Sequence, residues 1–147
     1  MCYNSVENTE KGDFIMISTK GRYAIRVMID LAENNDGKNV PLKDIAERQE
    51  ISKKYLEAIV KDLVASNLIK GSSGKGGGYS LIKKPDEYSI GEIIENTEGP
   101  LASVKCIADK SYKCPRKYMC QTLPMWEEFD EMVRNYFYSK KLSDLTK

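Results

Sequence analysis

The amino-acid sequence predicts a mainly α-helical protein with one small β-hairpin and a long helix near the C-terminus. Three observations lead to this class. Apolar residues recur with helical spacing between residues 19 and 98, two short β-prone pieces flank a glycine-rich stretch at 71–78, and a long amphipathic stretch follows Pro124. The chain has 147 residues, a length that suits one domain or one domain with an appendage.

The first half of the chain is expected to form three helices after a flexible N-terminal extension. Residues 1–15 are polar and lack periodicity, so we expect no element there. The first helix spans about Thr19–Glu33 and the second spans Leu42–Gln49. The third begins after Ser52, whose hydroxyl can accept a bond from a free backbone N–H, and ends near Asn67.

A hairpin and a fourth helix follow. Residues 68–70 and 79–82 are β-prone, and the glycines between them favour a hairpin with an open tip. The fourth helix starts after Ser89, which forms a capping box with Glu92, and Gly99 and Pro100 end it.

The order of helix, helix, tight turn, helix and hairpin is that of a winged helix-turn-helix, in which the third helix enters the DNA major groove. We assign residues 16–99 to this DNA-binding domain. The outward face of the third helix carries Lys53, Lys54, Glu57 and Lys61. Lysines there can neutralise phosphates or donate to guanine, and Glu57 can accept from a cytosine amino group. The alternative is an ordinary solvated helix face.

The hairpin tip adds a second set of DNA-binding candidates. Lys75 can reach the adjacent DNA backbone or minor groove, and Gly76 and Gly77 permit a close approach and offer backbone N–H groups to phosphate. The alternative is that the glycines only turn the hairpin.

Residues 100–122, called the cysteine segment below, lack periodicity and contain Cys106, Cys114 and Cys120. Thiolates bind iron and zinc, and nearby lysine and arginine residues favour the ionised thiols. The spacing is wider than that of zinc ribbons, so a metal site and free or redox-active thiols both remain open.

Residues 123–147 are assigned to a dimerisation helix and its tail. Large apolar side chains lie on one stripe of this helix, too much surface to leave exposed. The helix either folds back on its own chain or pairs with a second copy, and the spacing favours pairing. The predicted homodimer interface consists of Trp126, Phe129, Met132, Val133, Tyr136 and Phe137.

The composition excludes several functions. The chain has no histidine, which rules out Ser-His-Asp and Cys-His catalysis and any metal centre with a histidine ligand from this chain. We therefore do not expect an enzyme. No apolar run is long enough to span a membrane and no signal peptide opens the chain, so we expect a cytoplasmic protein with reduced cysteines.

Four segments resemble the Rrf-type winged-helix transcription regulators: ISTKGRY at 17–23, PLxxIAERQ at 41–49, ISxxYLE at 51–57 and GGGY at 76–79. The resemblance extends from residue 16 to about residue 145. It implies a homodimeric repressor that binds a palindromic operator in double-stranded DNA. It also extends the predicted DNA-contact set to Thr19, Lys20, Arg22, Ser52, Tyr55 and Ser73.

IscR-like members of this family bind an iron–sulfur cluster through three cysteines in the same segment. The resemblance therefore implies a 2Fe–2S or 4Fe–4S cluster on Cys106, Cys114 and Cys120, and control of iron–sulfur assembly genes. Two residues depart from the IscR-like pattern, because Leu123 stands where a histidine ligand is expected and Ser73 where the hairpin usually has an arginine. The first gap between cysteines is also two residues longer than usual.

Three alternatives remain at this point. The protein is a thiol-redox, nitric oxide or cysteine-metabolism regulator without a stable cluster, or a small iron–sulfur electron-transfer protein. A module that binds proteins rather than DNA also uses this fold.

Overall fold

The computed structural model describes residues 17–147, and the predicted N-terminal extension at 1–15 lies outside them. The predicted class, mainly α with one two-stranded sheet, is confirmed. The helices and strands are α1 (Thr19–Glu33), α2 (Leu42–Gln49), α3 (Lys53–Ala65), β1 (Ile69–Ser72), β2 (Gly78–Leu81), α4 (Ile90–Glu98), α5 (Lys105–Ala108) and α6 (Leu123–Ser139). Three short 3-10 helices are η1 (Pro85–Glu87), η2 (Lys117–Met119) and η3 (Leu142–Leu145).

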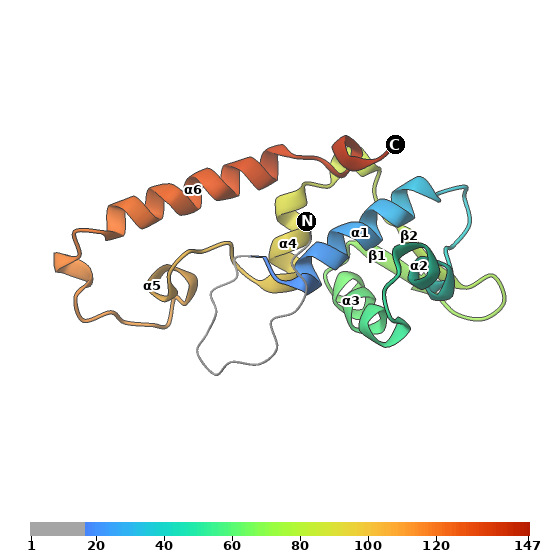
Figure 1. Ribbon diagram of the computed structural model, residues 1–147, viewed down its shortest axis with the longest axis horizontal. Helices are drawn as coiled ribbons and strands as arrows, with labels where there is room; N and C mark the ends of the chain where they lie inside the picture. The colour runs from blue at the N-terminus through green and yellow to red at the C-terminus, as the bar shows by residue number, and fades with distance from the viewer. Residues whose placement is uncertain (1–16) are drawn as a thin grey trace.

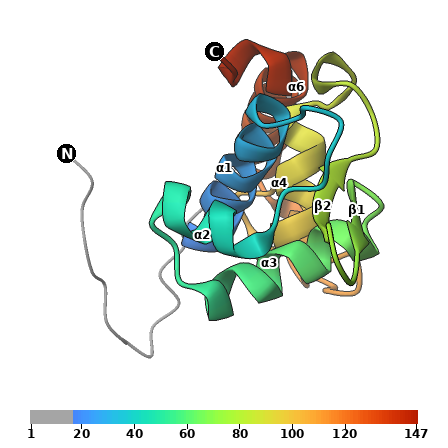
Figure 2. The ribbon, with the colours of Figure 1, turned by 90° about the vertical axis from the view of Figure 1, so that its right-hand side faces the viewer.

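The body of the molecule forms around α1 and α4, which pack side by side, with α3 running across one end of both (Figure 2). Their apolar stripes meet in one core, where Met28, Leu56 and Ile93 are fully buried. Burying each such side chain contributes about 1.5–3 kcal/mol. The core fixes how α3 is presented at the surface.

The turn between α2 and α3 is tight because Glu50 and Ile51 together end α2 and reverse the chain. Glu50 takes the left-handed conformation with φ 53°, and the Ile51 N–H then donates to the Ala46 carbonyl at 3.1 Å. Ser52 caps α3 as predicted, since its Oγ accepts from the Tyr55 N–H at 3.3 Å. The turn thereby sets the angle at which α3 leaves α2.

The hairpin is antiparallel, with Ile69 opposite Leu81 and Ser72 opposite Gly78. The observed strands, Ile69–Ser72 and Gly78–Leu81, differ from the predicted strands at 68–70 and 79–82 by one or two residues at each end. Leu68 lies outside β1 because its N–H donates to the Leu63 carbonyl at 3.0 Å and so still closes α3. Near the hairpin tip, both strands extend into the glycine-rich stretch, because the backbone groups of Gly71, Ser72 and Gly78 also take part in the strand pairing.

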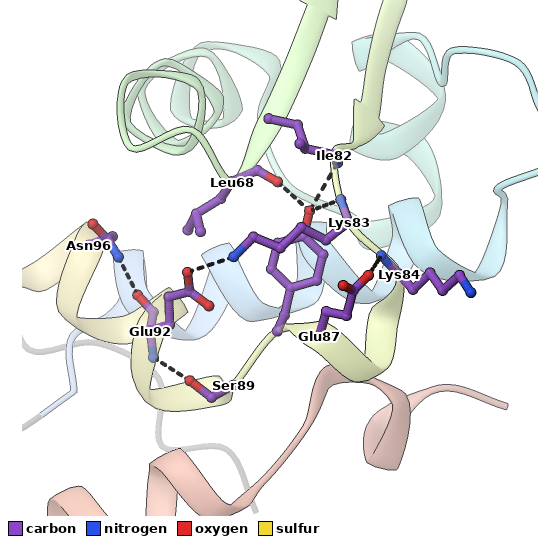
Figure 3. Close-up of polar contacts among 9 residues, drawn as sticks. Leu68, Ile82, Lys83, Lys84, Glu87, Ser89, Glu92 and Asn96 are labelled. Atoms are coloured by element: carbon purple, nitrogen blue, oxygen red, sulfur yellow. Dashed lines mark hydrogen bonds and ion pairs between the residues drawn. The ribbon is translucent and has the colours of Figure 1, made fainter.

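Tyr88 holds the base of the hairpin (Figure 3). Its fully buried hydroxyl donates to the Leu68 carbonyl at 2.7 Å and accepts from the N–H groups of Ile82 and Lys83, each at 2.9 Å. One side chain thus joins the start of β1 to the residues that follow β2. This role explains why Ile82 leaves the strand pairing.

The cap of α4 differs in part from the prediction. Ser89 Oγ accepts from the Glu92 N–H at 3.1 Å, as a capping serine does. The Glu92 carboxylate, however, lies 3.2 Å from Lys83 Nζ and forms an ion pair in place of the reciprocal half of the predicted capping box (Figure 3).

The long helix α6 returns from the cysteine segment to the body, and the segment lies at the end of the molecule remote from the hairpin (Figure 1). One residue of the predicted tail after α6 is part of the core. Leu142 is fully buried, and its N–H donates to the Tyr88 carbonyl at 3.0 Å. The Ile90 N–H donates to the Lys140 carbonyl at 2.8 Å, which anchors the C-terminal end of α6 beside α4.

The apolar stripe predicted for α6 separates into two faces. Trp126, Val133 and Phe137 are half-buried, and Phe137 packs against the core of its own chain. Part of the stripe is therefore partly covered within the chain, and the homodimer interface stays a prediction. The second face remains exposed, with Met125, Phe129, Met132 and Tyr136 each 40–65% accessible.

Candidate nucleic-acid interface and cysteine segment

The outward face of α3 is open along its length. Lys53, Lys54, Glu57 and Lys61 are exposed, as the sequence predicted, and Ser52 is exposed at the N-terminus. Three lysines at helical spacing give this face a positive potential, which suits a polyanion. Glu57 adds one acceptor within it.

Tyr55 is partly exposed and partly packed against α1. Its ring is 39% exposed and packs edge-on against Tyr23 of α1, with 5.6 Å between the ring centroids. The Arg26 guanidinium stacks on the Tyr23 ring, 5.1 Å from its centroid, and donates to the Gln49 side chain at 3.2 Å. Tyr55 is therefore held in place while its edge stays accessible.

The N-terminus of α1 lies next to α3. Thr19 and Arg22 are exposed, and Ser18 caps the helix by accepting from the Lys20 N–H at 3.2 Å. Lys20 is only half-exposed because its ammonium forms an ion pair with Asp62 of α3. A DNA contact by Lys20 would have to compete with this ion pair.

The hairpin tip presents backbone as well as side chains. Ser73, Lys75 and Gly76 are exposed, and Gly77 is half-buried. Gly76 has φ 74°, and a Cβ on Gly77 would lie 2.6 Å from the Ser72 carbonyl oxygen, so the tip requires glycine at both positions. The exposed α1, α3 and hairpin residues described above are called the candidate DNA-contact surface below.

A buried carboxylate on α1, Asp30, positions α2 through the exposed Arg48 and the half-buried Gln49, a contact that the sequence did not predict. Asp30 of α1 is 2% exposed and accepts from Arg48 Nε at 3.0 Å and Nη2 at 2.7 Å, and from Gln49 Nε2 at 3.0 Å. The hydrogen bonds to Asp30 raise the pKa of Arg48. The available signal was that Asp30 falls between Val27 and Leu31 on the apolar face of α1.

The structure does not bring the three cysteines together. Cys114 and Cys120 line one cavity, whereas Cys106 lies in α5 and lines a neighbouring cavity with Asp109 and Glu127. Among residues 17–147, no three His, Cys, Asp or Glu side chains lie close enough to share a metal ion.

The chemistry of the donors nevertheless suits a cluster, whose ligands are thiolates. The pKa of Cys120 is lowered first by the Thr122 hydroxyl, 3.5 Å from the sulfur, then by the backbone N–H groups of Thr122 and Leu123, and by the charge of Arg116. Leu123 itself begins α6 and has no ligating atom. The thiols fit an iron–sulfur cluster in type but are not arranged around one.

Comparison with known proteins identifies the family to which this fold belongs. A family profile described as an iron-dependent transcriptional regulator, Rrf2, matches residues 17–147. The chain belongs to the Rrf2 family. Among Rrf2 relatives, the HTH-type transcriptional regulator IscR of Aliivibrio salmonicida is 33% identical over 129 residues, which cover 88% of this chain and 76% of IscR.

Solved structures of Rrf2 proteins agree with the fold. CymR, the global cysteine regulator of B. subtilis, superposes with a TM-score of 0.71 and 33% identity, covering 90% of this chain and 96% of CymR. IscR of T. potens gives a TM-score of 0.69 and 33% identity, covering 88% of this chain and 84% of that chain. The predicted winged helix-turn-helix is confirmed, and the Rrf2 family supports transcription regulation and DNA binding. No helix of the described residues is long and apolar enough to cross a membrane.

Proposed function

We propose that this Rrf2 protein is a homodimeric repressor that binds a palindromic operator through the candidate DNA-contact surface. The observation that supports it most is the placement of exposed basic residues on three separate elements, α1, α3 and the hairpin tip. These elements lie where a winged helix-turn-helix contacts DNA. Family membership disfavours the electron-transfer alternative and the protein-binding module.

The residues divide into two roles. Lys53, Lys54 and Lys61 neutralise phosphates or donate to guanine, and Lys75 with the tip glycines holds the adjacent backbone. Glu57 reads a cytosine amino group and rejects other bases. Ser73 is too short to insert into the minor groove as an arginine does, so we expect little readout there.

The exposed face of α6 supports pairing with a second copy. Met125, Phe129, Met132 and Tyr136 form an apolar row on a helix that already uses its other face within the chain. A two-fold dimer then places two candidate DNA-contact surfaces about one helical turn of DNA apart, or a multiple of it.

The cysteine segment is the proposed regulatory part, with Cys106, Cys114 and Cys120 holding an iron–sulfur cluster. Three thiols on one segment, the lowered pKa of Cys120 and the iron-dependent description of the family support this role. A bound cluster would supply a centre sensitive to oxygen, nitric oxide or iron supply. Binding one cluster through all three thiols would bring Cys106 of α5 toward Cys120, which precedes α6, so the cysteine segment would have to rearrange.

A regulator that uses its thiols without a cluster is the second candidate. Two observations favour it: Cys114 and Cys120 share a cavity that Cys106 does not line, and the fold superposes well on CymR. In this case the DNA affinity follows the oxidation of thiols rather than the loss of a metal centre.

Purification without oxygen distinguishes the two candidates. A cluster gives a visible absorption band, iron and inorganic sulfide, and air bleaches the band and changes the affinity for DNA. Cys106→Ala, Cys114→Ala and Cys120→Ala each lose the band and keep the fold, whereas the control Cys2→Ala keeps both. Colourless protein whose DNA affinity responds to thiol oxidants supports the second candidate. One equivalent of zinc without sulfide contradicts the cluster.

A further inference from the structure

Two carboxylates of α4, one helical turn apart, contact two different helices. Glu98 Oε1 accepts from the Ser18 hydroxyl at 2.7 Å and from the Gly21 N–H at 2.8 Å, so it binds the N-terminus of α1. Glu95 accepts from the side chains of Arg134 and Tyr138, so it binds α6. Residues three apart lie on the same side of a helix, which places both contacts along one side of α4.

The Glu98 contact completes the first turn of α1. The first N–H groups of a helix have no partner within it, and a negative charge there is favoured by the helix dipole. Ser18 satisfies the Lys20 N–H, and Glu98 satisfies that of Gly21. Gly21 is buried, and a Cβ on it would overlap the Glu98 carboxylate, so this close approach depends on glycine. A residue of α4 therefore fixes the end of α1 that borders the candidate DNA-contact surface.

The Glu95 contact seats α6 on α4. The Arg134 guanidinium stacks on the Tyr138 ring, 4.5 Å from its centroid, and both groups meet the Glu95 carboxylate. The Tyr138 ring also lies against Gly91, where a Cβ would overlap it. The same carboxylate accepts from the Leu101 N–H at 3.4 Å, at the start of the cysteine segment.

We propose that Glu95 and Glu98 are positioning residues through which α4 couples the placement of α6 to the N-terminus of α1, and hence to the candidate DNA-contact surface. The helix is short, nine residues, so Glu95 and Glu98 keep a fixed spacing on one rigid element. A shift of α6 then moves α4 as one body. The Lys20–Asp62 ion pair carries the last step from α1 to α3. This coupling rests on the proposed DNA-binding function, because it supplies a route from the cysteine segment to the operator.

Hydrogen exchange tests the coupling apart from DNA binding. The readout is the exchange rate of the amides in residues 17–23, measured on the full-length protein, together with the affinity for operator DNA. Glu98→Ala removes the acceptor directly, so these amides exchange at least about tenfold faster and DNA binding weakens about fivefold. Glu95→Ala changes only contacts with α6 and Leu101, yet it also speeds exchange at 17–23 and weakens DNA binding about threefold.

Two further variants control for folding and charge. Glu92→Ala removes a carboxylate from the same helix whose partner is Lys83, so exchange at 17–23 stays at the wild-type rate. Glu95→Gln keeps a side-chain acceptor and restores slow exchange at 17–23. Unchanged exchange at 17–23 in Glu95→Ala overturns the coupling, and so does unchanged DNA affinity in Glu98→Ala. A wild-type protein that binds no DNA refutes the proposed function instead, while the exchange rates still decide whether α4 couples α6 to α1.

Discussion

The hydroxyl of Tyr88 donates a buried hydrogen bond of 2.7 Å to the carbonyl oxygen of Leu68, twenty residues earlier in the chain. Because the Tyr88 hydroxyl oxygen also accepts the N–H groups of Ile82 and Lys83, which follow β2, one core side chain sets the base of the hairpin. The direction in which the hairpin leaves the body, and thus the position of Lys75, depends on this hydroxyl.

Tyr88→Phe is expected to lower the free energy of unfolding by about 1–3 kcal/mol, because three backbone groups lose a buried partner. Urea denaturation measures it. Tyr118→Phe is the matched control, since Tyr118 is 99% exposed, and its stability stays at the wild-type value. An unchanged midpoint for Tyr88→Phe would show that water replaces the hydroxyl at the hairpin base.

Glu50→Gly is expected to stabilise the protein by about 1 kcal/mol, because Glu50 has φ 53° and glycine adopts this conformation without strain. Thermal unfolding at one pH gives the comparison. Glu47→Gly makes the same change inside α2, where glycine costs about 1 kcal/mol, so the two variants move the melting temperature in opposite directions. A loss of stability in both would mean that the Glu50 side chain contributes more than its backbone strain costs.

The local elements were predictable because their signals are local. The apolar spacing of α1 and α2 and the Ser52 cap are read from neighbouring residues, and the structure agrees at each. Asp30 and Leu142 were missed for the opposite reason. The partners of Asp30 are eighteen and nineteen residues away in α2, and Leu142 is buried only because α6 returns the chain to the start of α4. The apolar face of α1 marks Asp30 as a residue facing the core, but the identity of such distant partners is not contained in the local periodicity.

The candidate site divides in the same way. The exposure of Lys53, Lys54 and Glu57 follows from helical periodicity, so their placement on the surface was predictable. The pairing of Lys20 with Asp62 was not, because it joins two helices whose packing angle is set by the core. The arrangement of the cysteines depends on a segment with little regular structure, where spacing gives the residue types of a site without its geometry.

Tyr138 gives the protein a pH-dependent stability in the alkaline range. Burial and the Glu95 carboxylate, to which it donates, raise its pKa above the ordinary value of about 10. The unfolded chain then releases this proton at a lower pH than the folded one. The contribution is therefore complete below about pH 10 and is lost as the pH rises through the folded pKa.

Tyr138→Phe is accordingly expected to lose stability less steeply than the wild type above about pH 10. Urea unfolding at successive pH values measures the two slopes. Tyr118→Phe, which changes an exposed phenol, retains the wild-type slope. Parallel slopes for Tyr138→Phe and the wild type would mean that the phenol is not held by Glu95 in solution.

Pairing through the exposed face of α6 is tested by charge. Phe129→Asp with Met132→Asp places two carboxylates in the apolar row, and burying an unpaired charge disfavours association. We expect a monomer with unchanged helix content, measured by sedimentation velocity and circular dichroism. Asn135→Asp adds a charge to an exposed position of α6 outside that row and leaves the dimer intact. A double variant that still sediments as a dimer would place the interface elsewhere.

The division of roles within α3 is tested by two variants that should weaken DNA binding in different ways. Lys54→Ala removes one phosphate contact, so the affinity falls for every sequence and the slope of log affinity against log salt decreases by about one. Glu57→Ala removes an acceptor for one base instead, so discrimination at a single base pair falls by about 1–3 kcal/mol while the salt slope changes little. Fluorescence anisotropy over a salt series and a panel of single-base operator variants separates the two effects. Lys141→Ala, an exposed lysine after α6, controls for the loss of one positive charge and keeps both readouts at their wild-type values. If neither α3 variant alters binding, α3 does not enter the major groove, because a helix lying there cannot lose a phosphate contact and a base contact without effect.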